Sequence, residues 1–327
     1  MASNSITSNI TSSTITSSIA TPIVIFRQFV DQLPLIFVIF GLIGFLGNVL
    51  TYLQSELRSN TCCIYSLIGS LADVINLLLN LFANYLKLTY GITAPWLALT
   101  YLCPVQMASV TFLPYLSLNF LLMAIIDRYA STSSLTSSIR RLTQLKMAPW
   151  CILITIFISC LTTIRIFTLY EYRSTTGCTI TQPLTNNILY IIINGLMQPI
   201  TIFIFVILTF RNIRNSRRRV ATSAAVTIEN LHRSRNQFIK MIFVQIFVTA
   251  IISLQWTIMF SSVAFLYGGL RNLSPRSILY SFYLLSNYCY YLNNVKAFYL
   301  SLLTSRLFRE TLIQTLFKFL PFRYRNR

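Results

Sequence analysis

Two side chains of opposite charge lie inside long apolar stretches of this chain. Asp73 occurs in Leu71-Ala72-Asp73, and Lys296 is the one charged residue between 278 and 303. Charged groups are costly inside a membrane and mark functional positions there. The pattern therefore predicts an ion pair between Asp73 and Lys296, or a Lys296 that extends its ammonium to the membrane surface. With Asn48 and Asn293, these two residues form the predicted polar core.

Patterns typical of enzymes and metal sites are missing from the sequence. His232 is the only histidine, and no spacing of Cys with His fits a metal site. The chain has no glycine-rich phosphate loop and no helix with a pair of carboxylates for acid and base catalysis. We therefore expect neither an enzyme nor a cofactor.

The composition is that of a membrane protein. Of 327 residues, 55% are hydrophobic and only 10% are charged, whereas soluble proteins carry about 25% charged residues. The 26 basic and 7 acidic residues give a net charge of +19, which is also found in nucleic-acid-binding proteins. Here, however, the bases gather between apolar runs, where they set topology and meet anionic lipid. We expect a lipid bilayer and no nucleic acid as partner.

Seven apolar runs are long enough to cross a bilayer, which takes about 20 helical residues. They lie near 33–55, 64–86, 101–126, 147–168, 188–210, 238–267 and 278–303. The runs lack the alternation of barrel strands, so an all-α membrane protein with a seven-transmembrane-helix bundle is expected. Its predicted parts are a Ser/Thr-rich tail (1–30), the bundle (31–303), and a short cytoplasmic amphipathic helix with a basic tail (304–327).

Basic residues predict the orientation of this bundle. The connections on one side contain Arg58, the group from Arg140 to Lys146, the group from Arg211 to Lys240, and the basic tail. The connections on the other side contain only Arg27, Lys87, Arg173, Arg271 and Arg276. The positive-inside rule then places the N-terminus outside and the C-terminus in the cytoplasm, as in a multi-pass plasma-membrane protein. Asn9 and Asn272 begin Asn-x-Thr and Asn-x-Ser triplets, so we expect both to be outside and glycosylated.

Several motifs inside the runs occur at a characteristic spacing. Asp127-Arg128-Tyr129 closes the third run, Cys103 precedes Arg128 by 25 residues, and Trp96 precedes Cys103 by seven. With Asn48 and Asp73, this set resembles the rhodopsin-like family of G-protein-coupled receptors over roughly 30 to 310. The resemblance implies a disulfide between Cys103 and Cys178 of the second outer loop.

The sixth and seventh runs depart from the pattern of that family. Its Cys-Trp-x-Pro motif is Gln255-Trp256-Thr257-Ile258 here, so the proline that kinks the sixth helix is missing. Its Asn-Pro-x-x-Tyr motif aligns with the segment from Ala297 to Ser301, which puts Phe298 at the proline position. Some invertebrate peptide-receptor-like members share this phenylalanine, and they are the nearest in character.

The resemblance implies a function and a switch. A ligand from outside would shift the bundle toward a form that opens a cytoplasmic pocket for a heterotrimeric G protein. The switch would consist of Asp127, Arg128, Tyr129 and Trp256, with Arg128 paired to Asp127 at rest. Many members add an acid 18 residues before the sixth-helix Trp, but Phe238 occupies that position. We therefore expect some signalling without ligand.

The resemblance also places a ligand pocket in the outer half of the bundle. The position that carries an Asp in amine receptors is Val110, and no acid occurs between Asp73 and Asp127, so an amine is not expected. The pocket is predicted to contain Gln106, Val110, Thr111, Gln255, Trp256, Met259, Tyr283, Asn287 and Tyr291. Such amide, hydroxyl and aromatic groups suit a peptide, amidated for example, or a small neutral molecule.

Alternatives remain for Lys296 and for the function as a whole. The family binds sodium at the Asp that corresponds to Asp73, so either sodium or the Lys296 ammonium is expected there. Retinal chemistry is not expected, because the retinal lysine position is Tyr291. A chemosensory receptor for a small neutral molecule is one alternative. The other is a transporter that uses the Asp73 and Lys296 pair, although no internal repeat is evident.

Overall fold

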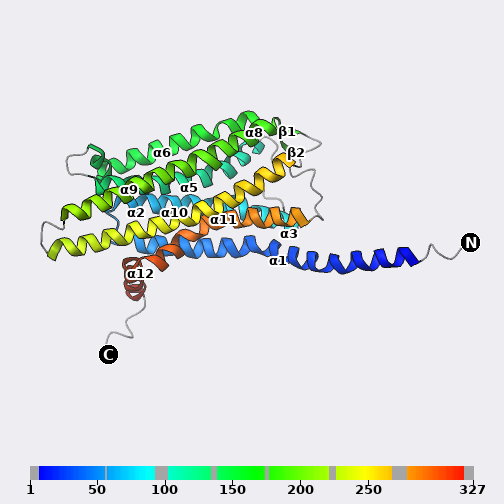
Figure 1. Ribbon diagram of the computed structural model, residues 1–327, viewed down its shortest axis with the longest axis horizontal. Helices are drawn as coiled ribbons and strands as arrows, with labels where there is room; N and C mark the ends of the chain where they lie inside the picture. The colour runs from blue at the N-terminus through cyan, green and yellow to red at the C-terminus, as the bar shows by residue number, and fades with distance from the viewer. Residues whose placement is uncertain are drawn as a thin grey trace, which may run out of the picture.

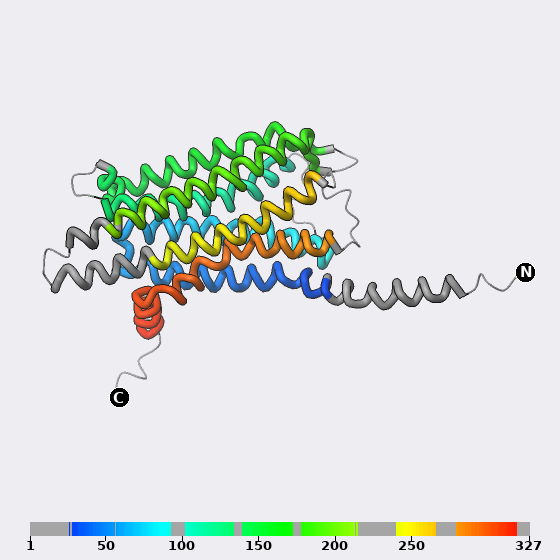
Figure 2. Tube along the Cα trace, viewed as in Figure 1, coloured from blue at the N-terminus to red at the C-terminus, as the bar shows by residue number. Residues whose placement is uncertain are grey.

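The computed structural model describes residues 7–55, 57–92, 102–133, 138–173, 177–220, 226–266 and 278–319. Within these ranges the chain is helical apart from one short β-hairpin, and the long helices lie side by side in a bundle (Figures 1 and 2). The hairpin lies at one end of the bundle, called here the hairpin end. The last helix, α12, leaves the bundle at the opposite end, called here the α12 end (Figure 1).

The elements follow one another along the chain with few breaks. In order they are α1 (Thr7–Tyr52), α2 (Thr61–Asn76), η1 (Leu77–Phe82), α3 (Ala83–Tyr90), α5 (Cys103–Thr132), η3 (Ser138–Thr143), η4 (Leu145–Met147), α6 (Ala148–Thr163), α7 (Arg165–Leu169), β1 (Tyr170–Arg173), β2 (Gly177–Ile180), α8 (Pro183–Tyr190), η5 (Ile191–Met197), α9 (Gln198–Val220), α10 (Val226–Leu266), α11 (Ile278–Thr304) and α12 (Arg306–Phe319). The strands pair antiparallel, with Tyr172 opposite Cys178.

Among the described residues, six helical stretches are long and apolar enough to cross a membrane. They are Gln28–Tyr52, Thr61–Tyr90, Cys103–Thr132, Leu145–Leu169, Pro183–Asn212 and Lys240–Phe265, and they match the first six predicted runs. Large apolar side chains point away from the bundle, among them Phe157, Phe203 and Phe210 at 63–65% exposure. An apolar outer surface of this kind needs lipid around it. The expectation of an all-α membrane protein is confirmed.

The seventh predicted run coincides with α11, which packs against α1 and α10. It is not among the stretches that are apolar enough to cross a membrane, because it carries Lys296 among several asparagines and tyrosines. The interior of the bundle accommodates these polar groups, since Asn293 and Asn294 are buried there.

Helix boundaries differ most from the predicted runs at the starts of α1 and α10. Helix α1 begins at Thr7 and α10 at Val226, whereas the apolar runs begin near 33 and 238. Hydropathy finds the part of a helix that lipid covers, but intrahelical hydrogen bonds continue into polar sequence. Helix α10 has no break over its whole length, as the missing proline predicts.

A short helix after the seventh run is present as α12. Ser305 caps it, because its Oγ accepts a hydrogen bond from the backbone N of Phe308 at 3.2 Å. Phe308 packs against Tyr52 and Phe298, with ring centroids 5.5 and 5.8 Å away. Gly47 makes room for Phe298, since a Cβ there would lie 2.2 Å from the ring. The phenylalanine at the proline position is thus a packing residue between α1, α11 and α12.

Candidate functional site

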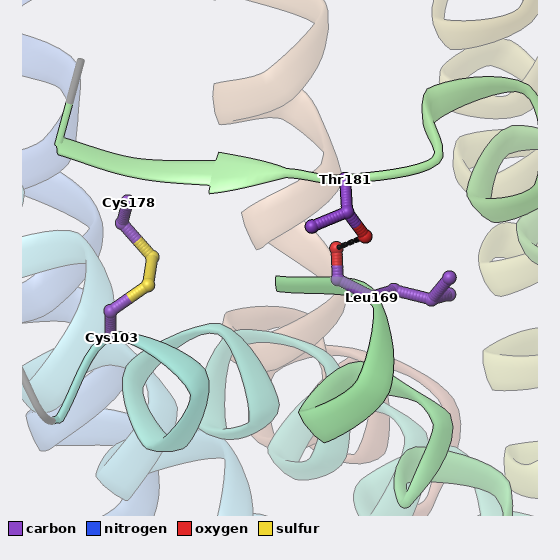
Figure 3. Close-up of a disulfide and its surroundings, with 4 residues drawn as sticks. All are labelled: Cys103, Leu169, Cys178 and Thr181. Carbon is purple, nitrogen blue, oxygen red and sulfur yellow. Dashed lines mark hydrogen bonds between the residues drawn. A yellow bond between two sulfur atoms is a disulfide. The ribbon is translucent and has the colours of Figure 1, made fainter. Parts of the chain in front are cut away.

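The hairpin end is held together by a disulfide. Cys103, the first residue of α5, is bonded to Cys178 of β2, with their Cα atoms 5.5 Å apart (Figure 3). Beyond the strand, Thr181 Oγ1 donates to the carbonyl oxygen of Leu169 at 3.1 Å (Figure 3). The backbone N of Thr181 donates to the same oxygen at 2.9 Å. The hairpin is therefore fixed at both ends of β2, and Tyr170 of β1 lies against the bundle.

A cavity of about 180 Å³ lies beneath this hairpin. Five of the predicted pocket residues line it: Val110, Thr111, Trp256, Asn287 and Tyr291. Gln106, Gln255, Met259 and Tyr283 do not line it. Gln255 is exposed and donates instead to Ser286 Oγ of α11. The cavity also receives Tyr170, Tyr190 and Arg165, which the sequence did not single out.

Trp256 is the centre of an aromatic cluster at this cavity. Its indole Nε1 donates to the Tyr190 hydroxyl at 2.8 Å, which joins α10 to α8. Rings of Phe260, Tyr283 and Tyr290 lie 5.4 to 5.9 Å from the Trp256 ring. The Trp256 side chain is buried, and it lines the cavity together with Phe260 of the same helix.

The predicted polar core is assembled in a second, smaller cavity of about 40 Å³. Asn48, Asp73, Asn293 and Lys296 all line it. The ammonium of Lys296 donates to the backbone O and the Oδ1 of Asn293, at 3.0 and 2.7 Å. It makes no ion pair with Asp73 among the described contacts, so the two charges share a cavity without direct contact. Lys296 also does not reach for the membrane surface.

Gln245 of α10 connects this region to the altered segment of α11. Its Nε2 donates to the carbonyl oxygen of Ala297 at 3.0 Å and to Ser301 Oγ at 2.9 Å. Ser301 stands where the resemblance expects a tyrosine. The two helices are therefore joined by an amide, at the place where the family motif is absent.

The α12 end contains the Asp127-Arg128-Tyr129 motif. The Arg128 guanidinium lies 3.7 Å from Asp127 Oδ2 and donates to Asn60 Oδ1. Thr61 Oγ1 donates to Asp127 Oδ1. Asn60 is the N-cap of α2, where its Oδ1 also accepts from the backbone N of Cys62 at 3.2 Å. Both members of the Asp127 and Arg128 pair are thus held by the start of α2.

The bundle is closed around Arg128. Asp127 and Arg128 are buried, and α5, α9 and α10 leave a space of only about 30 Å³ beside the guanidinium. Tyr129 packs edge-on against Phe205 of α9, with ring centroids 6.2 Å apart. This arrangement leaves no room for a protein partner at Arg128.

No family model and no curated protein sequence matches the chain. The resemblance to rhodopsin-like receptors is therefore carried by the motifs and their spacing. Among the sequence-predicted positions, Trp96 and Asn272 lie outside the described residues, as do the side chains of Asn9 and Phe238.

Sequence reasoning missed two functional candidates, Arg165 and Asn60. Arg165 lies within the fourth apolar run, so it belongs neither to the bases of the connections nor to the predicted polar core. A single arginine near the end of an apolar run was the available signal. Asn60 has no such signal, because only the fold brings the N-terminus of α2 to Arg128. The expectation of a pocket with only neutral polar groups is corrected by Arg165.

Proposed function

We propose that this chain is a receptor of the rhodopsin-like type. Six of its helices and α11 would cross the plasma membrane as seven spans, with the hairpin end outside and the α12 end in the cytoplasm. A ligand from outside, for which a peptide is our first candidate, would bind beneath the hairpin. Its binding would activate a heterotrimeric G protein at the opposite end.

The observation that carries this proposal is the separation of two sites along one helix. Thr111 lines the hairpin-end cavity and Arg128 lies at the α12 end of the same helix, α5. At 1.5 Å per residue, they are about 25 Å apart. A signal-transducing bundle needs a site that a ligand can enter and a second site that changes when the ligand binds. The cavity at the hairpin end and the buried ion pair at the α12 end are suited to these two roles.

The geometry supports a mechanism in which α10 transmits the signal. Trp256 lines the hairpin-end cavity, and Gln245 of the same helix bonds to α11. A ligand that displaces Trp256 would favour a position of α10 in which the Gln245 bonds break. Movement of α10 away from α5 would then uncover Arg128, which lies beside α9 and α10. The ligand acts by binding this open form more tightly.

The transporter alternative is not favoured. A transporter needs one site near the middle of the membrane that opens to either face. The cavity that holds Asp73 and Lys296 shares no lining residue with the hairpin-end cavity. The charged pair therefore lies apart from the cavity that a substrate would enter.

The test is G-protein activation in cells that express the chain, read with sensors for each G-protein class. The challenge is a library of peptides and small molecules, with Arg128→Ala as the inactive variant. Arg140→Ala is the matched control, because Arg140 is exposed at the same end. We expect a ligand response that Arg128→Ala abolishes and Arg140→Ala retains. A response that survives Arg128→Ala, or silence of the surface-expressed chain in every class, contradicts the proposal.

A further inference from the structure

Arg165 places an uncompensated positive charge in the hairpin-end cavity. It is the first residue of α7, directly beneath the hairpin, and its side chain is half-buried. Its Nε and Nη1 atoms are buried and have no hydrogen-bond partner among the described residues. Buried charged donors without partners are strongly unfavourable. The guanidinium therefore needs a hydrogen-bond acceptor, and the described residues do not provide one.

The other residues around the cavity are neutral. Its lining contains tyrosines, asparagines and apolar side chains, and none of the described carboxylates. Glu171, the nearest acid in sequence, is exposed on β1. Arg165 is therefore the one charged group among the lining residues, and a ligand with a single negative charge would neutralise it.

We propose that the hairpin-end cavity binds a ligand that carries a carboxylate, with Arg165 as its ion-pair partner. A guanidinium and a carboxylate match in shape and form two parallel hydrogen bonds. A phosphate group carries about 1.5 to 2 negative charges at neutral pH and would remain undercompensated here. This inference rests on the proposed function, because it names the ligand class of the same cavity, and it replaces the expectation of a neutral or amidated ligand.

The size of the cavity limits which carboxylate ligands can bind. Pockets for drug-sized ligands measure about 300 to 1,000 Å³, whereas this one has about 180 Å³. It fits a small carboxylic acid or the free C-terminus of a peptide with its last side chain. Aromatic rings of Trp256, Phe260 and Tyr290 provide the apolar wall against which such a side chain packs.

The experiment measures thermal unfolding of the purified chain in detergent, without a G protein. The probes are phenylacetate, hexanoate and a mixture of N-acetylated dipeptides with free C-termini, each compared with its own amide. We expect at least one acid to raise the melting midpoint by about 3 °C at saturation, while its amide has no effect. The small acids and the dipeptides distinguish the two sources of the carboxylate. The proposal is wrong if no acid exceeds its amide.

Variants of Arg165 test the role of the residue itself. Arg165→Gln should weaken acid binding at least tenfold, and Arg165→Lys should retain part of it. Lys87→Gln is the matched control, because it removes one exposed positive charge from the chain outside the cavity, and it should bind like the wild type. Equal acid binding by Arg165→Gln and the wild type would overturn the proposal.

A second readout needs no ligand. Arg165→Met removes the uncompensated charge, so the ligand-free variant should melt at a higher temperature than the wild type. A lower midpoint would show that the guanidinium already has a partner within the protein, and would overturn the proposal. Acid binding by a chain that activates no G protein would leave this inference standing and contradict only the receptor function.

Discussion

Among the described side chains, each end of the bundle has one buried or half-buried arginine, and the two differ in their surroundings. Arg165 at the hairpin end lines a cavity of about 180 Å³ and has no described partner for its Nε. Arg128 at the α12 end has Asp127 and Asn60 as partners, and only about 30 Å³ beside it. In the receptor that we propose, Arg165 could pair with a ligand directly, whereas Arg128 would first have to lose its partners. The proposal therefore has the signal pass from the hairpin end to the α12 end.

The largest expected effect concerns the hairpin that covers Arg165. Cys178→Ser removes the bond to Cys103, which spans 75 residues of sequence. Loss of a native disulfide costs about 2–4 kcal/mol, so the melting midpoint of the purified chain should fall by several degrees. Reductant should lower the wild-type midpoint to the same value and leave the variant unchanged. Identical midpoints for oxidised and reduced wild type would show that the hairpin is held without the disulfide.

The next effect concerns the partner of Arg128. Asn60→Ser retains an N-cap oxygen for α2 but is too short to reach the guanidinium. A hydrogen bond to a charged group contributes about 1.5–3 kcal/mol, so ligand-free G-protein activation should rise at least about tenfold. Because a neutral amide holds Arg128 less strongly than an acid would, the wild type should keep some basal activity.

Asn60→Asp is the matched variant for this measurement. It keeps the cap and offers Arg128 a carboxylate, so basal activation should fall below that of the wild type. Both variants are measured at equal surface expression with the same G-protein sensor. If neither changes basal activation, the bond between Asn60 and Arg128 does not restrain the closed end.

A smaller effect is expected from the joint between α10 and α11. Gln245→Met keeps the volume of the side chain and removes its bonds to Ala297 and Ser301. At the lower end of the range for neutral hydrogen bonds, about 0.5 kcal/mol each, the two bonds together contribute about 1 kcal/mol, which corresponds to about a fivefold rise in basal activation. Gln255→Met, which removes the bond to Ser286 near the other end of α10, is the control. If Gln255→Met raised basal activation more than Gln245→Met, the bonds of Gln245 would not be the main restraint between α10 and α11.

The smallest effect concerns the polar cavity between the two ends. The ammonium of Lys296 and the carboxylate of Asp73 line the same cavity of about 40 Å³. A sodium ion in this cavity would therefore be repelled by the positive charge of Lys296. Replacing potassium by sodium at constant ionic strength should leave the wild-type melting midpoint unchanged. Lys296→Ala should acquire a sodium-dependent rise in the midpoint, because the cavity then holds an uncompensated Asp73. A sodium-dependent midpoint in the wild type would contradict this assignment.

The sequence predicted the apolar helices well, because their positions depend on hydrophobicity and length, which are local properties. It also indicated four of the residues that line the polar cavity, namely Asn48, Asp73, Asn293 and Lys296, since charged and amide side chains are unusual inside apolar runs. The partners of these residues were not predictable. Lys296 bonds to Asn293 one helical turn earlier instead of to Asp73, and Arg128 bonds to Asn60, 68 residues away in sequence. Such contacts depend on helix packing, which the sequence pattern does not specify.

The central claim is that the closed α12 end opens when a G protein binds. Its most direct test is the distance between spin labels at Leu145→Cys and Lys240→Cys, two exposed positions at that end. Cys160→Ser removes the exposed native thiol from the background. We predict that an excess of nucleotide-free heterotrimeric G protein lengthens this distance by several ångström, and that Arg128→Ala prevents the change. An unchanged distance in the labelled chain with intact Arg128, across all G-protein classes, would contradict the account.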